Sequence, residues 1–172
     1  VAGDEICDFE LISKFGSLRF LDTGGAQVRN LNLISRLRRL ESLVYSTVMS
    51  NVTQGLTNQQ APVSRMSVLD ISMISGLPVL KQLRIINTAL SNQESLKEAK
   101  SIMELELVRN NLADLAFLRG SGNLLFLSVA DNNVSDLTPL QRLPSLTTLS
   151  LSNNRIENVA PLSALSNLRN LD

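Results

Sequence analysis

Glu104 and Glu106 are the two residues whose types and spacing come closest to a catalytic arrangement. On a β-strand they would share one face, about 6–7 Å apart, which invites comparison with the carboxylate pair of a glycosidase. A flat sheet face supplies no burial that would separate the two pKa values, so we interpret both as solvated charges. The sequence has no histidine and one cysteine, Cys7, which removes Ser-His-Asp, Cys-His and multi-cysteine metal sites. We therefore expect no catalytic residue, no metal site and no enzyme activity.

The charge and glycine patterns do not favour a cofactor, a nucleic acid or a membrane as the ligand. Sixteen Lys and Arg balance sixteen Asp and Glu, so bulk attraction to nucleic acid or an anionic membrane is not favoured. Arg36, Arg38 and Arg39 form the only basic cluster, and the outward strand positions show no basic stripe. Gly24 and Gly25 lack a surrounding phosphate-binding motif, so we expect no cofactor. No apolar run approaches the roughly 18 residues of a membrane span, so we expect no membrane insertion.

The elements that must position any functional side chain follow a 22-residue repeat. Leucine provides 33 of the 172 residues and recurs in the pattern LxxLxLxxNxIxxVxxLxxL. Read back from the C-terminus, the copies begin at Leu146, Leu124, Ile102 and Leu80. Consecutive copies without an insertion are far beyond chance, and they indicate an architecture of stacked repeats.

The same period divides the whole chain into units that become less regular toward the N-terminus. We expect one domain over residues 1–172, and because both ends fall in mid-unit we expect it to be an internal piece of a longer protein. The interval from Leu40 to Leu80 is four short of two units, and we divide it into two. The expected units are 1–17 (partial), 18–39, 40–57 (irregular), 58–79, 80–101, 102–123, 124–145, 146–167 and 168–172 (partial).

The spacing within a unit predicts its local structure. The LxLxx segment alternates with period two, which indicates a short strand with leucine facing inward, and the rest repeats every three residues, as in 3₁₀ turns. Ser91 followed by Glu94 resembles a capping box, so we expect an α-helix over residues 92–101. Asn110, Asn132 and Asn154 follow the last strand leucine by three residues. We expect their side chains to form a ladder of hydrogen bonds with the turns of adjacent units.

These residues resemble the leucine-rich-repeat family, in the 22-residue subclass shared by SDS22-like phosphatase regulators and bacterial internalins. Residues 102–172 carry the resemblance most closely, in "LSVADNNVSDLTPLQRLPSL" and "LSLSNNRIENVAPLSALSNL". Residues 41–66 depart from it. The resemblance implies an α/β solenoid with a curved parallel sheet on the concave face and 3₁₀ or short α-helical return segments on the convex face. It also implies a protein-binding scaffold that uses the concave face.

The strand register predicts which side chains point outward on that face. Ile86, Val108 and Ala130 form an apolar row on a surface that should be wet, with Phe126 beside it, and charged residues surround the row. An apolar centre with a charged rim is typical of an interface, although the four residues could simply pack on one another. Arg84 and Glu106 fit a lateral surface ion pair better than direct partner contacts. The candidate protein-binding residues are Phe20, Asp22, Arg84, Ile86, Glu104, Glu106, Val108, Arg109, Phe126 and Ala130.

Two functions remain open at this point. The first is a non-catalytic protein–protein interaction scaffold or regulatory subunit, within a larger assembly or alone. For this function an intracellular location is favoured, because the sequence shows no cysteine-rich caps. The second is a surface-exposed or secreted recognition protein, internalin-like or receptor-like, which the low charged fraction of 19% and two N-glycosylation triplets, at Asn51 and Asn133, would suit. Both functions need a protein partner, whose identity the sequence does not give.

Overall fold

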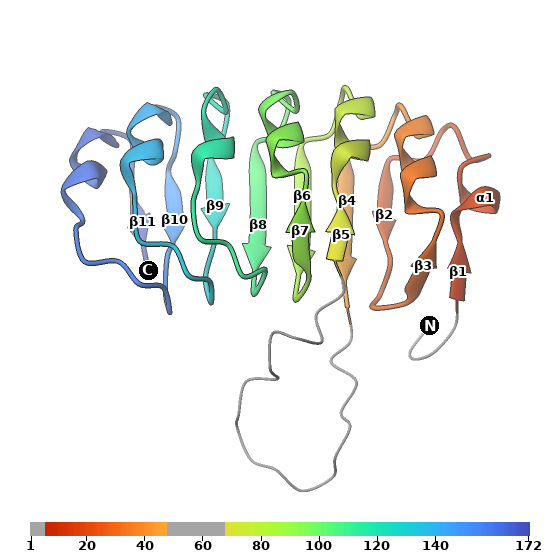
Figure 1. Cartoon of the computed structure of the whole chain (residues 1–172). Coiled ribbons are helices and arrows are strands. Elements are labelled where there is room, and N and C mark those ends of the chain that lie inside the picture. The colour runs from red at the N-terminus through yellow and green to blue at the C-terminus, as the bar shows by residue number, and fades with distance from the viewer. Residues whose placement is uncertain (1–5, 48–67) are drawn as a thin grey trace, which may run out of the picture.

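A computed structural model describes residues 6–47 and 68–172 of the chain. Seven parallel strands form one long sheet in the order β11-β10-β9-β8-β6-β4-β2, so chain order and spatial order agree throughout. Figure 1 shows the turns stacked side by side from β2 to β11. The strands are β2 (Phe20–Asp22), β4 (Ser42–Ser46), β6 (Gln82–Ile86), β8 (Glu104–Val108), β9 (Phe126–Ser128), β10 (Thr148–Ser150) and β11 (Asn170–Leu171).

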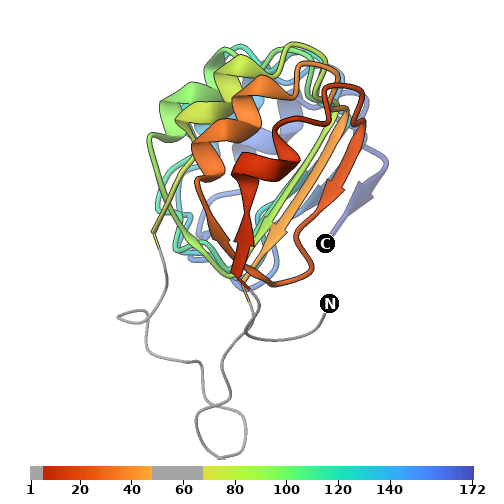
Figure 2. The same ribbon diagram turned by 90° about the vertical axis from the view of Figure 1, so that its right-hand side faces the viewer.

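Short helices form the second layer, opposite the long sheet, as Figure 2 shows along the stack. One is α-helical, α1 (Phe9–Ile12), and the described remainder are 3₁₀ helices, as the spacing of three predicts. Two of these helices have a proline in their first turn, Pro139 and Pro161, whose ring fixes φ near the helical value. The 3₁₀ helices are η1 (Leu31–Arg36), η3 (Ser72–Gly76), η4 (Gln93–Lys97), η5 (Ala116–Leu118), η6 (Thr138–Arg142) and η7 (Ala160–Ala164).

The core lies between the two layers and consists of the repeated leucines. Leu83, Leu105, Leu127 and Leu149 occupy one register position of successive strands, and each is at most 2% exposed. One turn cannot bury its own leucines, so the neighbouring turn covers them, and stacking is the main source of stability. The predicted class of fold, a leucine-rich-repeat solenoid with a parallel sheet, is confirmed.

The expected division of residues 40–79 into two units is wrong. Strand β4 pairs directly with β6, with Ser42 opposite Gln82 and Ser46 opposite Ile86, so the two strands are immediate neighbours in the long sheet. The helical layer agrees, because η1 packs on η3. Adjacent strands are thus 40 residues apart in sequence at this step, from Ser42 to Gln82, where the regular spacing is 22, and residues 48–67 lie outside the described part of the chain.

Two details of the return segments also differ from the sequence-based expectation. The α-helix expected over residues 92–101 is instead the 3₁₀ helix η4, and its N-cap is the left-handed Asn92 without a side-chain cap hydrogen bond, so the expected capping box at Ser91 does not form. Four unexpected strands form two small parallel pairs. They are β1 (Ile6–Asp8) with β3 (Gln27–Arg29), and β5 (Val68–Asp70) with β7 (Ala89–Ser91).

Candidate functional site: an apolar row on the long sheet

The apolar row of Ile86, Val108 and Ala130 is continuous across three neighbouring turns. Ile86 and Val108 are directly opposite each other in the β6–β8 register. The backbone N–H of Arg109 donates to the carbonyl of Ala130 at 3.2 Å, which brings the β9 turn alongside. All three side chains are partly exposed rather than buried. The long sheet therefore presents an apolar strip to its open face instead of covering it with its own side chains.

Charged and polar pairs lie beside this row, at the neighbouring outward positions of the same strands. Arg84 Nε lies 2.8 Å from Glu106 Oε2, and Gln82 Nε2 donates to Glu104 Oε2 at 2.9 Å. The Arg84 side chain is 51% exposed, so this ion pair is a lateral surface contact that contributes little stability. It neutralises the edge of the apolar row, which lowers the cost of covering that edge with a partner.

A shallow hollow of about 240 Å³ opens over the centre of the long sheet, where β4, β6, β8 and β9 meet. Its walls combine the two polar pairs with apolar side chains from both flanks. Phe126 closes it on the β9 side, and Val44 closes it on the β4 side. The lining residues are Ser42, Leu43, Val44, Gln82, Leu83, Arg84, Glu104, Leu105, Glu106 and Phe126. The sequence did not indicate a role for Val44, because its closeness to Arg84 depends on the direct pairing of β4 with β6.

Arg109 has an unusual backbone conformation at the end of the apolar row. Its φ of 57° is left-handed, a region that non-glycine residues other than Asn and Asp rarely adopt. The equivalent residues of other turns, Asn87, Asp131 and Asn153, are also left-handed but are of tolerant types. Arg109 Nε contacts Asp131 Oδ2 at 3.0 Å, and Asp131 Oδ1 accepts from Asn153 Nδ2 at 2.7 Å. This chain of contacts holds the guanidinium beside the row.

Two candidate residues lie apart from the rest. Phe20 and Asp22 belong to β2, and β4 separates them from the apolar row on β6. Phe20 is 65% exposed with the guanidinium of Arg19 at 5.9 Å from its ring centre, and Asp22 accepts a hydrogen bond from the backbone N–H of Gly24 at 2.8 Å. Asp22 thus has a structural role in its turn, and the structure brings together only the other eight candidates.

The three repeated asparagines support the turns next to the site. The side-chain oxygen of Asn110 accepts from the N–H of Thr88, and that of Asn132 accepts from the N–H groups of Asn110 and Leu112. Asn154 accepts from the N–H of Val134. Because each amide bridges adjacent turns, the ladder fixes the register of the strands that carry the apolar row.

Metal clusters and membrane-spanning helices are both absent from the described residues. Within residues 6–47 and 68–172, no three His, Cys, Asp or Glu side chains are grouped so as to hold a metal ion. In the same part of the chain, no helix has the length and apolar character required to span a bilayer. The side chain of Cys7 and the triplet at Asn51 lie outside the described residues, whereas Asn133 Nδ2 donates to Asn111 Oδ1.

Comparison with solved structures identifies the fold. An internalin, InlF, of Listeria monocytogenes matches 93% of the chain with 27% identity and a TM-score of 0.73. A leucine-rich-repeat protein of Leptospira interrogans matches 95% with 24% identity and a TM-score of 0.75. Internalin C2 of Listeria monocytogenes matches 96% with 25% identity and a TM-score of 0.69.

The chain is shorter than these proteins, since it spans 42% of InlF, 38% of the Leptospira protein and 75% of internalin C2. No protein-family model matches the sequence, and no curated protein sequence does so. The sheet order, the 22-residue register and these structural matches together identify the chain as a leucine-rich-repeat solenoid, a fold that serves in general as a scaffold for protein interactions.

Proposed function

We propose that this chain is a non-catalytic protein-binding module whose partner binds on the open face of the long sheet, over the apolar row. The observation that carries the proposal is the half-exposed strip of Ile86, Val108 and Ala130. A partner would bury this strip together with Phe126, while the Arg84–Glu106 and Arg109–Asp131 pairs form the polar surround. The 22-residue register also supports placing the chain in the subclass shared by SDS22-like proteins and internalins.

The geometry of the face suits a partner with a ridge or an extended segment. The apolar row crosses the strands at right angles to their direction, so its three side chains follow one another at about the 4.8 Å strand spacing. The hollow lies alongside and is large enough to hold one partner side chain. Since Gln82 and Arg84 are already paired within the sheet, we expect the partner to contribute mainly apolar contacts and to leave those pairs intact.

A charge placed in the row tests the proposal. We would capture partners with wild-type protein, with Val108→Glu and with Val159→Glu, and identify them by mass spectrometry. Val159 is a matched control because it is 63% exposed and lies at the start of η7, away from the long sheet. We expect Val108→Glu to lose the main partner, by at least about tenfold, because a buried unpaired carboxylate is costly. We expect Val159→Glu to retain it, and both variants to keep the wild-type circular dichroism.

Equal capture by wild type and Val108→Glu would exclude the apolar row as the docking site. Loss by both variants would show that the added charge, and not its position, is responsible, and would equally exclude it.

The second candidate function, a surface-exposed recognition protein, gains support from the two internalin structures, which are 25–27% identical to this chain. This second function would use the same face of the long sheet, and it differs from the first only in the cellular compartment of the protein. Immunolabelling of intact cells distinguishes the two functions, because an exterior protein is labelled without permeabilisation and an interior scaffold is labelled only after it.

A further inference from the structure

Basic side chains gather on one edge of the solenoid, although the whole chain is neutral. The relevant segments run from the last residue of each short helix to the residue before the next strand of the long sheet: 12–19, 36–41, 76–81, 97–103, 118–125, 142–147 and 164–169. They contain eleven of the sixteen Lys and Arg but only two of the sixteen Asp and Glu, namely Glu41 and Glu98. We call these cations the basic edge: Lys14, Arg19, Arg36, Arg38, Arg39, Lys81, Lys97, Lys100, Arg119, Arg142 and Arg169.

The basic edge is accessible and mostly without charge partners. Ten of its members are exposed, and Lys97 is partly exposed. Glu41 bridges Arg19 and Lys81, at 2.5 and 3.0 Å, and Lys97 pairs with Glu94. The other eight cations form no ion pair with any described residue. Every turn contributes at least one cation, so the positive charge runs the length of the stack.

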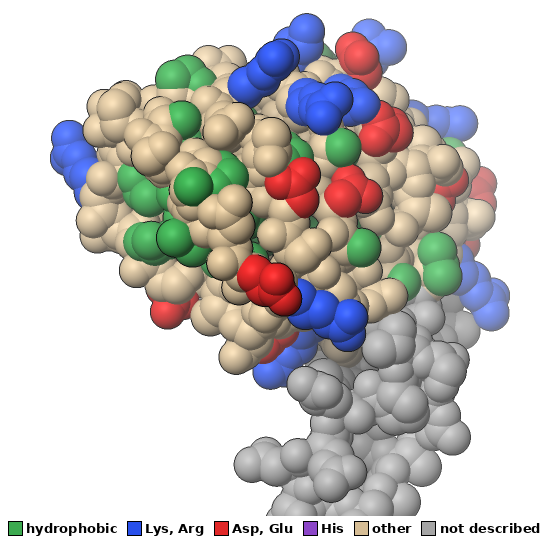
Figure 3. Space-filling view, turned by 60° about the vertical axis from the view of Figure 1, so that its left-hand side comes forward, with side chains coloured by type: hydrophobic (Ala, Val, Ile, Leu, Met, Phe, Trp, Pro, Cys, Tyr) green, Lys and Arg blue, Asp and Glu red, His purple; other side chains and the backbone are tan. Residues whose placement is uncertain are grey.

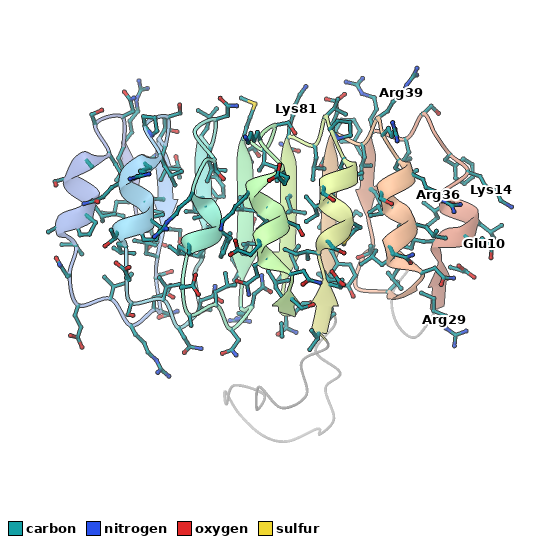
Figure 4. The ribbon with its side chains drawn as sticks, turned by 45° about the horizontal axis from the view of Figure 1, so that its top comes forward. Glu10, Lys14, Arg29, Arg36, Arg39 and Lys81 are labelled. Atoms are coloured by element: carbon teal, nitrogen blue, oxygen red, sulfur yellow. The ribbon has the colours of Figure 1, made fainter. Side chains whose placement is uncertain are left out.

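The figures show this segregation directly. Blue side chains crowd the upper edge in Figure 3, and most of the red ones lie below them. In Figure 4, Lys81 and Arg39 project from the upper edge, whereas Arg29 projects from the opposite edge. The outward positions of the strands carry no basic stripe, because the cations of the basic edge lie in the connections between the two layers.

Exposed apolar side chains are interleaved with these cations. Phe15 is 62% exposed, Val79 is 40% exposed and Met103 is 38% exposed, and all three lie in the same segments. Nothing in the described structure packs over them. Cations together with apolar side chains on a single surface are typical of proteins that lie on anionic bilayers, where the cations meet lipid phosphates and carboxylates and the apolar groups enter the headgroup region.

We propose that the basic edge binds an anionic lipid bilayer surface, with the stack lying along the membrane. The turns reach a common level along the top of Figure 1. A flat membrane surface can therefore contact the basic edge at every turn simultaneously. Fourteen of the sixteen acidic residues lie outside the edge segments, so few like charges would oppose the anionic surface. Single-stranded nucleic acid fits less well, because it needs aromatic platforms along a groove, and Phe15 is the edge's one aromatic residue. This mode of binding involves no spanning segment.

Sedimentation with vesicles tests the proposal. The full chain is mixed with vesicles of phosphatidylcholine alone or with about 30% phosphatidylserine, at low and high salt. We expect binding only to the anionic vesicles, with loss at high salt as the charges are screened. The variant Arg38→Glu/Arg39→Glu should lower the partition coefficient at least about tenfold, since each basic residue near an anionic surface multiplies binding several-fold.

The matched control is Arg29→Glu/Arg155→Glu, which changes the net charge equally at exposed cations outside the basic edge. We expect it to bind within about twofold of wild type, because those positions are turned away from the surface. Absence of binding to the anionic vesicles would overturn the proposal, and so would equal loss by both double variants. Binding of a fluorescent poly-uridylate strand without binding of vesicles would show that the edge serves nucleic acid instead. None of these residues belongs to the apolar row, so this test and the partner-capture test fail independently.

Discussion

Asn132 carries its side chain into the turn before its own, where its Oδ1 accepts the backbone N–H of Asn110 at 3.0 Å. The same oxygen accepts the N–H of Leu112 at 2.9 Å, and Nδ2 donates to the carbonyls of Leu107 and Val129 at 2.7 and 2.9 Å. Nδ2 also donates to the carbonyl of Ala130 at 3.0 Å, so one buried amide bonds five backbone groups on two turns. The repeated leucines stack the turns, and this amide fixes how far one turn is offset from the next.

Asn132→Ala should therefore be strongly destabilising. Removal of the amide takes away the acceptor of the Asn110 and Leu112 N–H groups and a donor to the Leu107 carbonyl in a buried region, which costs roughly 1–3 kcal/mol or more. Urea unfolding followed by circular dichroism measures the change. The control is Asn123→Ala, an exposed asparagine whose amide donates to a single carbonyl, that of Lys100. A loss of stability no larger for Asn132→Ala than for Asn123→Ala would contradict the role given to the ladder.

Gly76→Ala should weaken the packing of the two helices that flank the long turn. A Cβ at Gly76 would lie 2.7 Å from Cβ of Ser35 and 3.1 Å from its carbonyl oxygen, so η3 must move away from η1. Forced overpacking of this kind costs about 1–3 kcal/mol. Gly122→Ala is the control, because a Cβ there meets no atom within 4 Å. Thermal unfolding compares the two variants, and equal melting temperatures would show that η1 and η3 are not in close contact.

Thr23→Val should stabilise the protein. Thr23 occupies the inward position that Ile85, Leu107 and Val129 hold in later turns, and its hydroxyl is buried without a hydrogen-bond partner among the described residues. Valine has nearly the same shape and no polar group to leave unpaired, so we expect a gain of about 1 kcal/mol. Chemical denaturation measures it, with Thr138→Val, at an exposed threonine, as the control. A destabilised Thr23→Val would mean that the hydroxyl is satisfied after all.

Glu41 should make stability depend on acidic pH. Hydrogen bonds from Lys81 and Arg19 lower the pKa of the Glu41 carboxyl below its usual 4.5. A carboxyl with a lowered folded-state pKa stabilises the fold above its unfolded pKa and loses that contribution as the pH falls through the folded value. Between about pH 5 and pH 3, wild type should therefore lose more stability than Glu41→Gln. Parallel pH dependences of the two melting temperatures would contradict this assignment.

The sequence predicts those features that depend on the period alone. Leu83, Leu105, Leu127 and Leu149 recur at the same position of every repeat, and one inward position per turn is the only arrangement that buries all of them. For the same reason the sequence predicts that Ile86 lies next to Val108 and Arg84 next to Glu106, because the residues of each pair are one 22-residue repeat apart. The direct pairing of Ser42 with Gln82 does not follow, because a segment of nearly twice the regular length can be read as two turns.

Features that depend on three-dimensional placement could not be read from the spacing. The left-handed φ of Arg109 is imposed by the turn, and an arginine gives no sign of it. The cations of the basic edge do not share one position of the 22-residue repeat, since Arg39, Lys81, Lys100 and Arg142 occupy different repeat positions. They share an edge only because all the connections from the short helices to the long sheet lie on that edge.

The central claim is that consecutive turns stack in register, with β4 directly against β6. A disulfide test is the most direct measurement, made on Ser42→Cys/Gln82→Cys in a Cys7→Ser background. Ser42 and Gln82 are neighbouring positions in the sheet, within the reach of about 7 Å between Cα atoms that a disulfide allows. Mild oxidation should therefore join them, whereas Ser42→Cys/Glu104→Cys, two strands and about 10 Å apart, should remain reduced. Failure of the first pair to form, or formation of the second, would contradict the stacking on which the apolar row and the basic edge both depend.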